Sequence, residues 1–373
     1  MTVATHPLRG AEVAVERLDV RAYTIPTDAP EADGTLSWDA TTIVVVRAYA
    51  GDAQGLGYTY ASSAAATLIC DALLDVVGGA DALAPAAAWE RMRRATRNLG
   101  RQGLASTAVS AVDTALWDLR ARLLELPLCD AIGTVRDDVP LYGSGGFTSY
   151  TADHLRAQLC GWVEQGIGRV KMKVGSEPEL DPARVRTARS AIGPHPELMV
   201  DANGAYARKQ ALALADRFHG EAGVCWFEEP VGSDDLDGLR LVRDRAPAGM
   251  EVAAGEYGWT LADFRALLDA QAVDVLQADV TRCGGITELL RVDALCRAAR
   301  VPLSLHCAPA LHAHPALALS QLRHLEWFHD HVRIESLLFD GVDEPRCGAL
   351  HPDRLRPGNG LALKEADAER WAA

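Results

Sequence analysis

The chain contains no CxxC pair, although it has eight cysteines. Structural zinc sites typically need such closely spaced ligands, so the sequence argues against one. Most of the cysteines lie in strand or helix patterns and are expected to be small buried hydrophobic side chains. Cys307 differs because it follows His306, but the sequence shows no general base that would make it a nucleophile.

The sequence also lacks an excess of positive charge and a long apolar run. Its net charge of −14 argues against nucleic acid or an anionic membrane as a partner. An anionic substrate is not excluded, because local cations or a metal can override the global field. No apolar run approaches the ~20 residues of a membrane span. No basic and then apolar leader opens Met1–Ala11, so we expect a soluble cytoplasmic protein.

No low-complexity linker divides the chain, but its pattern changes near residue 136. The first part is β-rich and then helical, which predicts an α+β domain over residues 1–135. Pro26–Trp38 is expected to be a long polar loop because it contains two prolines and a glycine. The expected strands and helices are Val13–Ile25, Thr41–Tyr49, Gly55–Ala61, Ala64–Val77, Ala88–Leu99 and Leu104–Leu124.

Residues 136–334 alternate between short apolar strands and amphipathic helices. This alternation predicts a closed parallel barrel, a modified TIM barrel of the type (β/α)7β. Residues 335–373 contain no further βα unit and are expected to pack back on the N-terminal domain. The expected strands are Val139–Ser144, Gly168–Val174, Glu197–Val200, Val224–Phe227, Glu251–Ala254, Val273–Gln277, Pro302–Leu305 and, more weakly, His324–Trp327.

Ionisable residues follow consecutive apolar runs at intervals of 23 to 28 residues. Each interval fits one strand, one helix and two loops. The C-terminal ends of barrel strands form the working face, so these side chains are expected to converge there. A charge that ends a buried strand is costly unless it is used or paired. The residues are Lys173, Asp201, Glu228, Glu256, Asp279 and His306.

Two lysines lie on one side of the same expected strand. Lys171 and Lys173 are two residues apart in GRVKMKVG, so a strand directs both to one face. Their repulsion is expected to lower one lysine pKa and provide an amine base near neutral pH. The alternative is a pair of exposed edge lysines, which a closed barrel disfavours because it has no edge.

Three carboxylates of metal-binding type end successive strands. Asp201, Glu228 and Glu256 lie in VDANG, WFEEP and AGEY. Close carboxylates stay ionised only if a hard cation joins them, and Mg²⁺ with all-oxygen ligation fits. The alternative is helix capping combined with salt bridges. Glu229 is interpreted as a supporting residue rather than as a ligand.

An acid and a histidine end adjacent strands further along. A carboxylate at Asp279 can orient the His306 imidazole and raise its basicity, so that its other nitrogen acts as acid or base. Glu326 ends the last strand and, as a protonated acid, could donate to a developing enolate oxygen; otherwise it is a surface glutamate. We interpret His329–His331 as a polar loop.

Taken together, these motifs resemble the enolase superfamily, mandelate racemase subgroup, over nearly the whole length. The helix expected at Ser110–Arg122 and the segment Val139–Gly146 are also similar to that family. The matching motifs are K-x-K at Lys171–Lys173, D-A-N at Asp201–Asn203, EEP at Glu228–Pro230, GE at Gly255–Glu256, D-x4-GG at Asp279–Gly285 and the later His306.

The resemblance implies a role for each matching position. The N-terminal domain is implied to be a cap whose loop selects the substrate. The implied Mg²⁺ ligands are Asp201, Glu228 and Glu256. The implied acid/base and carboxylate-activating residues are Lys171, Lys173, Asp279, His306 and Glu326. The implied substrate-contacting residues are Asn203, Thr27, Trp38 and Tyr142.

Asp279 decides the subgroup, because related cycloisomerase-like members carry a lysine five residues before the Gly-Gly pair and this chain has Asp279 there. The family often has a lysine three residues further on, where this chain has Arg282; we expect little effect on the chemistry.

The polar residues of Thr27–Ser37 favour Mg²⁺-dependent dehydration of a sugar acid to a 2-keto-3-deoxy acid. A racemase or epimerase is the alternative, and a non-catalytic protein is a remote one. The family also implies a homo-oligomer.

Overall fold

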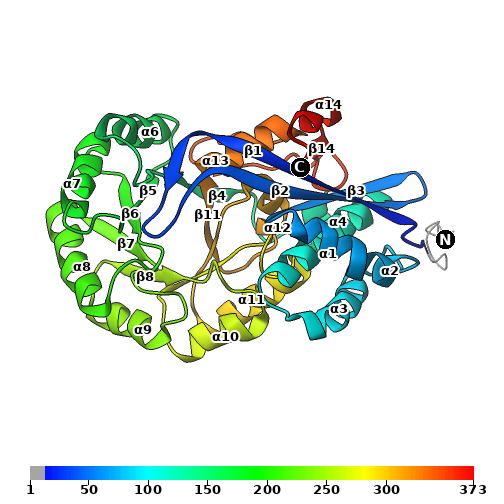
Figure 1. The fold of residues 1–373 in the computed structure, drawn as a ribbon, viewed down its shortest axis with the longest axis horizontal. Coiled ribbons are helices and arrows are strands. Elements are labelled where there is room, and N and C mark those ends of the chain that lie inside the picture. The colour runs from blue at the N-terminus through cyan, green and yellow to red at the C-terminus, as the bar shows by residue number, and fades with distance from the viewer. Residues whose placement is uncertain (1–12) are drawn as a thin grey trace, which may run out of the picture.

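The computed structural model describes residues 13–373. The predicted absence of a leader concerns Met1–Ala11 and lies outside these residues. In the described chain a cap lies beside an α/β barrel, and two long cap strands extend across the face of the barrel (Figure 1). No helical segment in residues 13–373 combines the length and apolar character that a bilayer crossing requires.

The cap contains an antiparallel sheet in the order β1-β2-β3, with β1 (Arg17–Ala32), β2 (Ser37–Ala50) and β3 (Ala53–Tyr60). Strand β2 is buried on both sides because its side chains alternate between two cores. Ile43 and Val45 pack in the core shared with the barrel. Val44 and Val46 pack against the cap helices.

The expected loop Pro26–Trp38 is wrong, because most of it continues the β1–β2 hairpin. The register breaks only between Pro26 and Glu31. Prolines are tolerated on an edge strand and at an irregular register, and β1 is an edge strand. The hairpin closes where Asp33 Oδ1 accepts hydrogen bonds from the backbone amides of Thr35 at 2.6 Å and Leu36 at 2.8 Å.

The cap helices surround a long central helix. Gly57 of β3 allows close approach to this helix, because a Cβ there would lie 2.3 Å from Thr114 Oγ1 and 2.4 Å from the Ala115 nitrogen. The expected helix Ala64–Val77 is present and contains a π-helical turn at Ile69–Leu73. The cap helices are α1 (Ala64–Leu68), α2 (Leu74–Val77), α3 (Pro85–Ala95), α4 (Leu104–Leu123) and α5 (Leu128–Ile132).

Within residues 13–373, eight parallel strands form a barrel that closes where β11 pairs with β4. This confirms the predicted fold class, a modified TIM barrel with an N-terminal α+β cap. The barrel strands are β4 (Val139–Gly145), β5 (Arg169–Lys173), β6 (Glu197–Asp201), β7 (Val224–Glu228), β8 (Glu251–Ala254), β9 (Val275–Ala278), β10 (Leu303–Leu305) and β11 (Leu322–Phe328).

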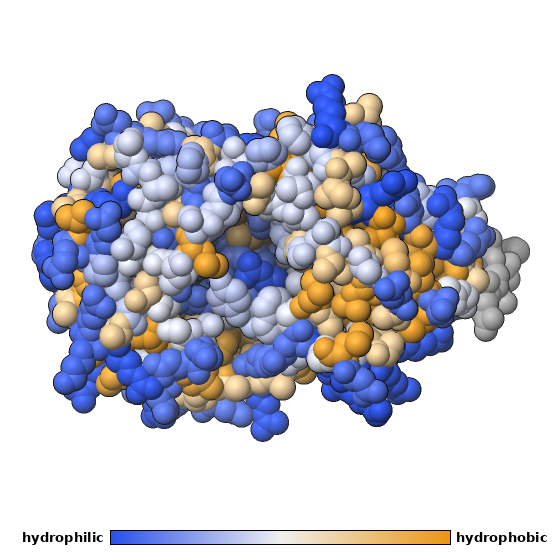
Figure 2. Space-filling model, viewed as in Figure 1, coloured by the Kyte–Doolittle hydropathy of each residue, from blue (hydrophilic) through white to orange (hydrophobic). Residues whose placement is uncertain are grey.

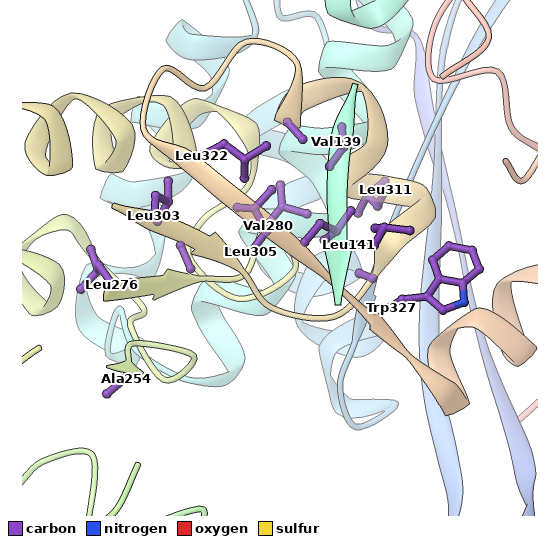
Figure 3. Close-up of a cluster of buried hydrophobic side chains, with 14 of the residues drawn as sticks. Val139, Leu141, Ala254, Leu276, Val280, Leu303, Leu305, Leu311, Leu322 and Trp327 are labelled. Atoms are coloured by element: carbon purple, nitrogen blue, oxygen red, sulfur yellow. The ribbon is translucent and has the colours of Figure 1, made fainter. Parts of the chain in front are cut away.

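One helix follows each of the first seven barrel strands in the described chain and covers the outside of the barrel. The main apolar core lies between strands and helices, where Figure 3 shows Leu141, Leu305 and Leu322 packed near Leu311 of the last of these helices. The barrel helices are α6 (Ala152–Glu164), α7 (Asp181–Ile192), α8 (Arg208–Ala222), α9 (Leu236–Arg245), α10 (Leu261–Asp269), α11 (Ile286–Ala299) and α12 (Pro309–Ala316).

The segment after β11 connects barrel and cap. Leu350 pairs with Val139 of β4, and Ala372 forms a bridge with Tyr23 of β1. The end of the chain therefore lies against the cap sheet. Its elements are α13 (His329–Leu338), β12 (Phe339–Asp340), β13 (Ala349–Leu350), β14 (Ala362–Leu363) and α14 (Glu365–Ala368).

Candidate active site

Three neighbouring barrel strands end with ionisable side chains that stand side by side. Lys173, Asp201 and Glu228 are the last residues of β5, β6 and β7. The strand register pairs Lys173 with Asp201, and Asp201 with Glu228. All three side chains are buried. The spacing along the sequence therefore becomes direct contact at the C-terminal rim of the barrel.

The expected metal-binding carboxylates converge at this rim. Asp201, Glu228 and Glu256 each offer a carboxylate oxygen, and these oxygens lie within 4.8 Å of one another. Burial and the charge of Asp201 raise the pKa of Glu228 to about 8. Glu256 Oε2 is buried and has no hydrogen-bond partner within the described chain. Its nearest ion-pair contact is His306 Nε2 at 3.4 Å. Three buried carboxylates, one with an oxygen that accepts no hydrogen bond, suit a hard cation with all-oxygen ligation, such as Mg²⁺.

The two lysines of β5 form ion pairs with acids from neighbouring strands. Lys171 Nζ donates to Glu228 Oε1 at 2.6 Å and lies 2.8 Å from Glu326 Oε1. Lys173 Nζ donates to Asp201 Oδ2 at 2.5 Å. Both lysines therefore face the rim from one side of β5, as the two-residue repeat predicts.

The expected lowering of a lysine pKa is wrong for this arrangement. Burial lowers the pKa of Lys173, Asp201 raises it and Lys171 lowers it, which leaves the pKa above its usual value. Burial likewise lowers the pKa of Lys171, but Glu228 and other acids raise it well above normal. The prediction counted the repulsion between lysines along one strand. The opposing acids come from other strands, so only the closed barrel brings them into range.

Asp279 holds the His306 imidazole in a fixed orientation. His306 Nδ1 lies 2.8 Å from Asp279 Oδ2, and the amide and hydroxyl of Thr281 both donate to Asp279 Oδ1 at 2.7 Å. Burial lowers the pKa of His306, but Glu256, Glu326 and Asp279 raise it above its usual value. Because Nδ1 faces Asp279, the Nε2 atom is left for proton transfer.

Glu326 connects the lysine side of the rim with the histidine side. Its Oε1 faces Lys171, whereas its Oε2 accepts a hydrogen bond from the Cys307 amide at 3.0 Å and lies 3.7 Å from His306 Nε2. Burial raises the pKa of Glu326, but Lys171 and His306 lower it well below its usual value. This low pKa disfavours the expected protonated acid and favours a carboxylate at Glu326.

A cavity of about 370 Å³ opens between this rim and the cap. Figure 2 shows a hollow near the middle of this face, with hydrophilic residues at its bottom. The volume lies in the range of about 300–1,000 Å³ typical of small-molecule sites. The cap side of the wall includes Asp33, Trp38, Thr41, Thr42, Tyr60 and Ser62. The barrel side includes Lys173, Asn203, Glu256, Tyr257, Arg282, His306, Cys307, Glu326, Phe328 and His331.

Two of the four expected substrate-contacting residues line this cavity, namely Asn203 and Trp38. Asn203 Oδ1 accepts a hydrogen bond from Lys173 Nζ at 3.0 Å. Trp38 Nε1 donates to Glu31 Oε2 at 2.8 Å, and its ring meets Phe147 edge-on. The cap therefore contributes a fixed aromatic side chain to the wall.

The other two expected contacts, Thr27 and Tyr142, are not among the residues that line the cavity. Thr27 lies in β1 where the register with β2 breaks. Tyr142 is fully buried beneath the rim, with Lys171 Nζ 5.2 Å from the centre of its ring. Tyr142 supports a charged residue of the site rather than facing a substrate.

Arg282 is a wall residue whose importance the sequence underestimated. Its Nη1 donates to Glu256 Oε1 at 3.2 Å, and its Nε lies 3.6 Å from Asp279 Oδ2. Its guanidinium also lies over the ring of Tyr257, which lines the cavity too. The sequence does place Arg282 three residues after Asp279, which indicates that the two side chains can meet. Its contact with Glu256 crosses strands and could not be read from that spacing.

His331 is a second wall residue that the sequence missed. The run His329–His331 forms the first turn of α13 instead of the expected polar loop. His331 Nδ1 accepts a hydrogen bond from the Ala308 amide at 3.2 Å, and its ring stacks on Tyr60. Burial lowers the pKa of His331 to about 3, so it is a neutral wall group.

Two family models together match most of the chain. The model described as mandelate racemase / muconate lactonizing enzyme, N-terminal domain, matches residues 19–133. The model described as enolase C-terminal domain-like matches residues 154–367. The matched segments contain the cap and most of the barrel.

A curated relative and two solved structures are similar over nearly their whole length. The 3,6-anhydro-alpha-L-galactonate cycloisomerase of Streptomyces coelicolor is 33% identical over 365 residues, which cover 94% of this chain and 97% of that protein. The first solved structure is a mandelate racemase/muconate lactonizing enzyme-like protein from Rubrobacter xylanophilus. It is 58% identical, with a TM-score of 0.95, and the match covers 96% of this chain and 100% of the Rubrobacter chain.

The second structure is L-talarate/galactarate dehydratase from Salmonella typhimurium, liganded with Mg and L-lyxarohydroxamate. It is 27% identical, with a TM-score of 0.88, and covers 100% of this chain and 96% of that one. Magnesium is thus present in a relative of the same fold, as the prediction of Mg²⁺ requires. These matches show that the chain belongs to the mandelate racemase/muconate lactonizing enzyme family of the enolase superfamily, and is a lyase or isomerase of that superfamily.

Proposed function

We propose that this enzyme removes the α-proton of a sugar-acid carboxylate and expels the β-hydroxyl, giving a 2-keto-3-deoxy acid. The observation that carries the proposal is the placement of two proton-transfer groups on one cavity. Lys173 ends β5 and His306 follows β10, and both line the same cavity together with Glu256. In one direction around the closed barrel, strands β4 and β11 separate β5, which carries Lys173, from β10, which precedes His306. A substrate in the cavity would therefore have an amine on one face and an imidazole on the other.

The residues that would hold Mg²⁺ are Asp201, Glu228 and Glu256. The bound cation would supply positive charge that neutralises both the acidic cluster and the substrate carboxylate, so that loss of the α-proton becomes less costly. Lys171 adds a fixed positive charge beside the cluster, 2.6 Å from Glu228 Oε1. It would stabilise negative charge that develops on the substrate carboxylate.

Lys173 takes the α-proton in this proposal. Its Nζ is held between Asp201 Oδ2 and Asn203 Oδ1, so the amine has a fixed direction. Lys173 must be neutral to accept this proton, and Lys171 on the same face favours the neutral form. Asp201 holds the pKa of Lys173 above its usual value, and a cation bound by Asp201 would offset that effect. A positioned base of this kind contributes roughly 10²–10⁴-fold to the rate of proton transfer.

His306 completes the dehydration. Asp279 accepts a hydrogen bond from Nδ1–H and stabilises the imidazolium, so Nε2 can donate a proton to the departing β-hydroxyl. The carbon–oxygen bond breaks, water leaves, and the resulting enol tautomerises to the 2-keto-3-deoxy acid. Asp33, Thr41 and Thr42 give the cap wall a polar character that suits a polyol. The similarity to L-talarate/galactarate dehydratase supports this class of substrate.

An isomerase is the second candidate, and the similarity to a cycloisomerase over nearly the whole chain favours it. If the substrate presents no leaving group to His306, the same imidazole returns a proton to the opposite face of the carbon. The product is then a stereoisomer or a rearranged isomer rather than a dehydrated acid. The two candidates share Lys173 and His306 and differ in what faces His306.

Proton NMR in D₂O with Mg²⁺ and a panel of aldonic, aldaric and uronic-derived acids separates these candidates. A new deoxy methylene signal supports the dehydratase, and loss of an α-proton signal without it supports the isomerase. Lys173→Ala and His306→Asn serve as controls and are expected to abolish turnover. Full turnover in both variants would contradict the acid/base assignment.

Assembly and location stay predictions. We infer an even-numbered homo-oligomer from the family resemblance, and we keep a cytoplasmic location as a proposal. Sedimentation velocity tests the first, because a monomer at micromolar concentration would contradict it. Fractionation of the producing cells tests the second.

A further inference from the structure

Three ligand atoms of different chemistry form a compact triangle on the cavity wall. Cys307 Sγ lies 3.3 Å from His306 Nε2 and 3.4 Å from Glu326 Oε2. His306 Nε2 lies 3.7 Å from Glu326 Oε2, which closes the triangle. All three residues are buried, and all three line the cavity. The triangle is thus protected from bulk water but open to a small molecule or ion in the cavity.

The backbone is strained to bring the thiol to this position. Cys307 and Ala308 have φ angles of 52° and 43°, in the left-handed region that residues other than glycine rarely adopt. Such a conformation costs about 1–3 kcal/mol per residue and persists only where surrounding contacts hold it. Here the Cys307 amide donates to Glu326 Oε2, and its carbonyl oxygen accepts from His312 Nδ1 at 2.9 Å. The turn places the thiol beside the imidazole of His306, directly after the end of β10.

The dimensions of the triangle fit a tetrahedral metal ion. Zinc binds nitrogen, sulfur and oxygen ligands at about 2.0–2.3 Å, so two ligand atoms at a tetrahedral angle lie roughly 3.3–3.6 Å apart. The two sides that meet at Cys307 Sγ, 3.3 and 3.4 Å, fall in this range, and the side between His306 Nε2 and Glu326 Oε2 is slightly longer at 3.7 Å. The fourth position would face the cavity.

Asp279 supplies the supporting contact that such a site needs. A histidine that binds zinc usually donates its other ring N–H to a carboxylate, which fixes the tautomer and strengthens the ligand. His306 has this arrangement, because its Nδ1 lies 2.8 Å from Asp279 Oδ2. Lys171 contacts the other oxygen of Glu326, so Oε2 accepts the Cys307 amide hydrogen bond and keeps a second lone pair for a cation.

We propose that His306, Cys307 and Glu326 form a second cation site, selective for zinc-like ions. It lies directly beside the carboxylate cluster Asp201–Glu228–Glu256, because His306 Nε2 is 3.4 Å from Glu256 Oε2. Magnesium prefers oxygen ligands, whereas thiolate and imidazole select borderline-soft ions such as Zn²⁺. Binding releases the thiol proton and uses the neutral imidazole and the ionised carboxylate. Zinc at this site occupies His306 Nε2 and therefore inhibits the enzyme. Only the inhibition rests on the proposed function, because binding itself does not depend on turnover.

Cobalt is a direct probe of this site, because a tetrahedral cobalt–thiolate centre absorbs in the near ultraviolet and the visible. The experiment adds Co²⁺ to the full-length protein in saturating Mg²⁺, so that the carboxylate cluster is already filled. We expect a thiolate-to-cobalt charge-transfer band in the wild type and its loss in Cys307→Ser and His306→Asn. Cys347→Ser is the matched control, because Cys347 is an exposed free thiol and its removal should leave the band unchanged.

The absence of the band in the wild type, or its persistence in Cys307→Ser, would overturn the proposal. Addition of Zn²⁺ should abolish the cobalt band. Cys307→Ser removes a ligand and should weaken zinc binding by more than the roughly 10–100-fold that loss of a supporting contact costs. Inhibition of turnover by zinc, relieved in Cys307→Ser, would support the inhibitory role. A cobalt band in a protein that turns over no sugar acid would support the cation site while contradicting the proposed function.

Discussion

Asp279 and His306 form a carboxylate–imidazole pair in which Nδ1 and Oδ2 lie 2.8 Å apart. The other oxygen of Asp279 is held by the amide and hydroxyl of Thr281, so the carboxylate cannot rotate without losing two hydrogen bonds. The imidazole is thereby fixed with Nε2 on the cavity side. A pair of this kind determines both the tautomer and the direction of proton transfer.

Asp279→Asn should impair the histidine without disturbing the lysine. We expect kcat to fall by roughly 10²–10⁴-fold, because the amide cannot stabilise the imidazolium that donates the proton. Exchange of the substrate α-proton with D₂O, which Lys173 performs, should continue. Steady-state kinetics and NMR exchange measured on the same sample test this. Loss of both activities to the same extent would contradict a separate role for His306.

Glu228→Gln should weaken Mg²⁺ binding. A ligand that binds only the folded state stabilises it by about 2.7 kcal/mol at a concentration of 100 times its Kd. We therefore expect Mg²⁺ to raise the Tm of the wild type and to raise that of Glu228→Gln much less. Glu229→Gln is the matched control, because the neighbouring acid is not assigned as a ligand. An unchanged wild-type Tm over a Mg²⁺ titration would count against the metal site.

Gly57→Ala should destabilise the cap. Its new Cβ would lie 2.3 Å from Thr114 Oγ1 and 2.4 Å from the Ala115 nitrogen, so β3 and α4 would have to separate. Overpacking of this kind costs about 1–3 kcal/mol, or more where backbone must move. Urea unfolding should show the loss. Gly161→Ala in α6 is the control, because a Cβ there meets nothing within 4 Å in the described chain; an equal loss in both variants would contradict the packing argument.

Glu335 should make the stability of the protein depend on pH. Burial raises its pKa to about 8, against hydrogen bonds from Tyr58 Oη at 2.6 Å and the Ala310 amide at 3.0 Å. The folded state therefore binds a proton that the unfolded state releases near the usual value of 4.5. Stability is present below that value and falls as the pH rises toward 8, by at most about 1.4 kcal/mol per pH unit.

Glu335→Gln should remove this contribution. Urea unfolding at several pH values between about 5 and 9 should show a shallower decline of the unfolding free energy for the variant than for the wild type. Other buried acids, such as Asp113 with a pKa of about 7, contribute to both proteins and cancel in the difference. Parallel curves for the two proteins would show that Glu335 does not carry the effect.

The barrel could be predicted from the sequence because each of its strands is a local pattern. Apolar runs with a polar last residue recur at intervals that fit one βα unit, as at Lys173, Asp201 and Glu228. Parallel strands of a barrel end on the same rim, so the identity of the rim residues followed from the order of the strands. In the structure Lys173, Asp201 and Glu228 lie next to one another at the rim, as their order along the chain predicted.

The cap hairpin and much of the cavity wall could not be predicted in this way. Pro26 and Pro30 carry a strong local loop signal, yet they lie in the edge strand β1, where missing amide donors are tolerated. His331 becomes a wall residue only because it stacks on Tyr60 of the cap. Such contacts join residues that are hundreds of positions apart and leave no periodic trace in the sequence.

The sequence by itself determined the fold class, the strand ends and the chemical type of each rim residue, because these depend on residue identity and short-range spacing. The tertiary structure decided how the charges balance. In the folded chain Lys173 forms an ion pair with Asp201, Arg282 forms one with Glu256, and the Cys307 thiol contacts the His306 imidazole. Electrostatic interactions and ligand geometry depend on distances across strands within a few ångströms, and only the closed barrel fixes those distances.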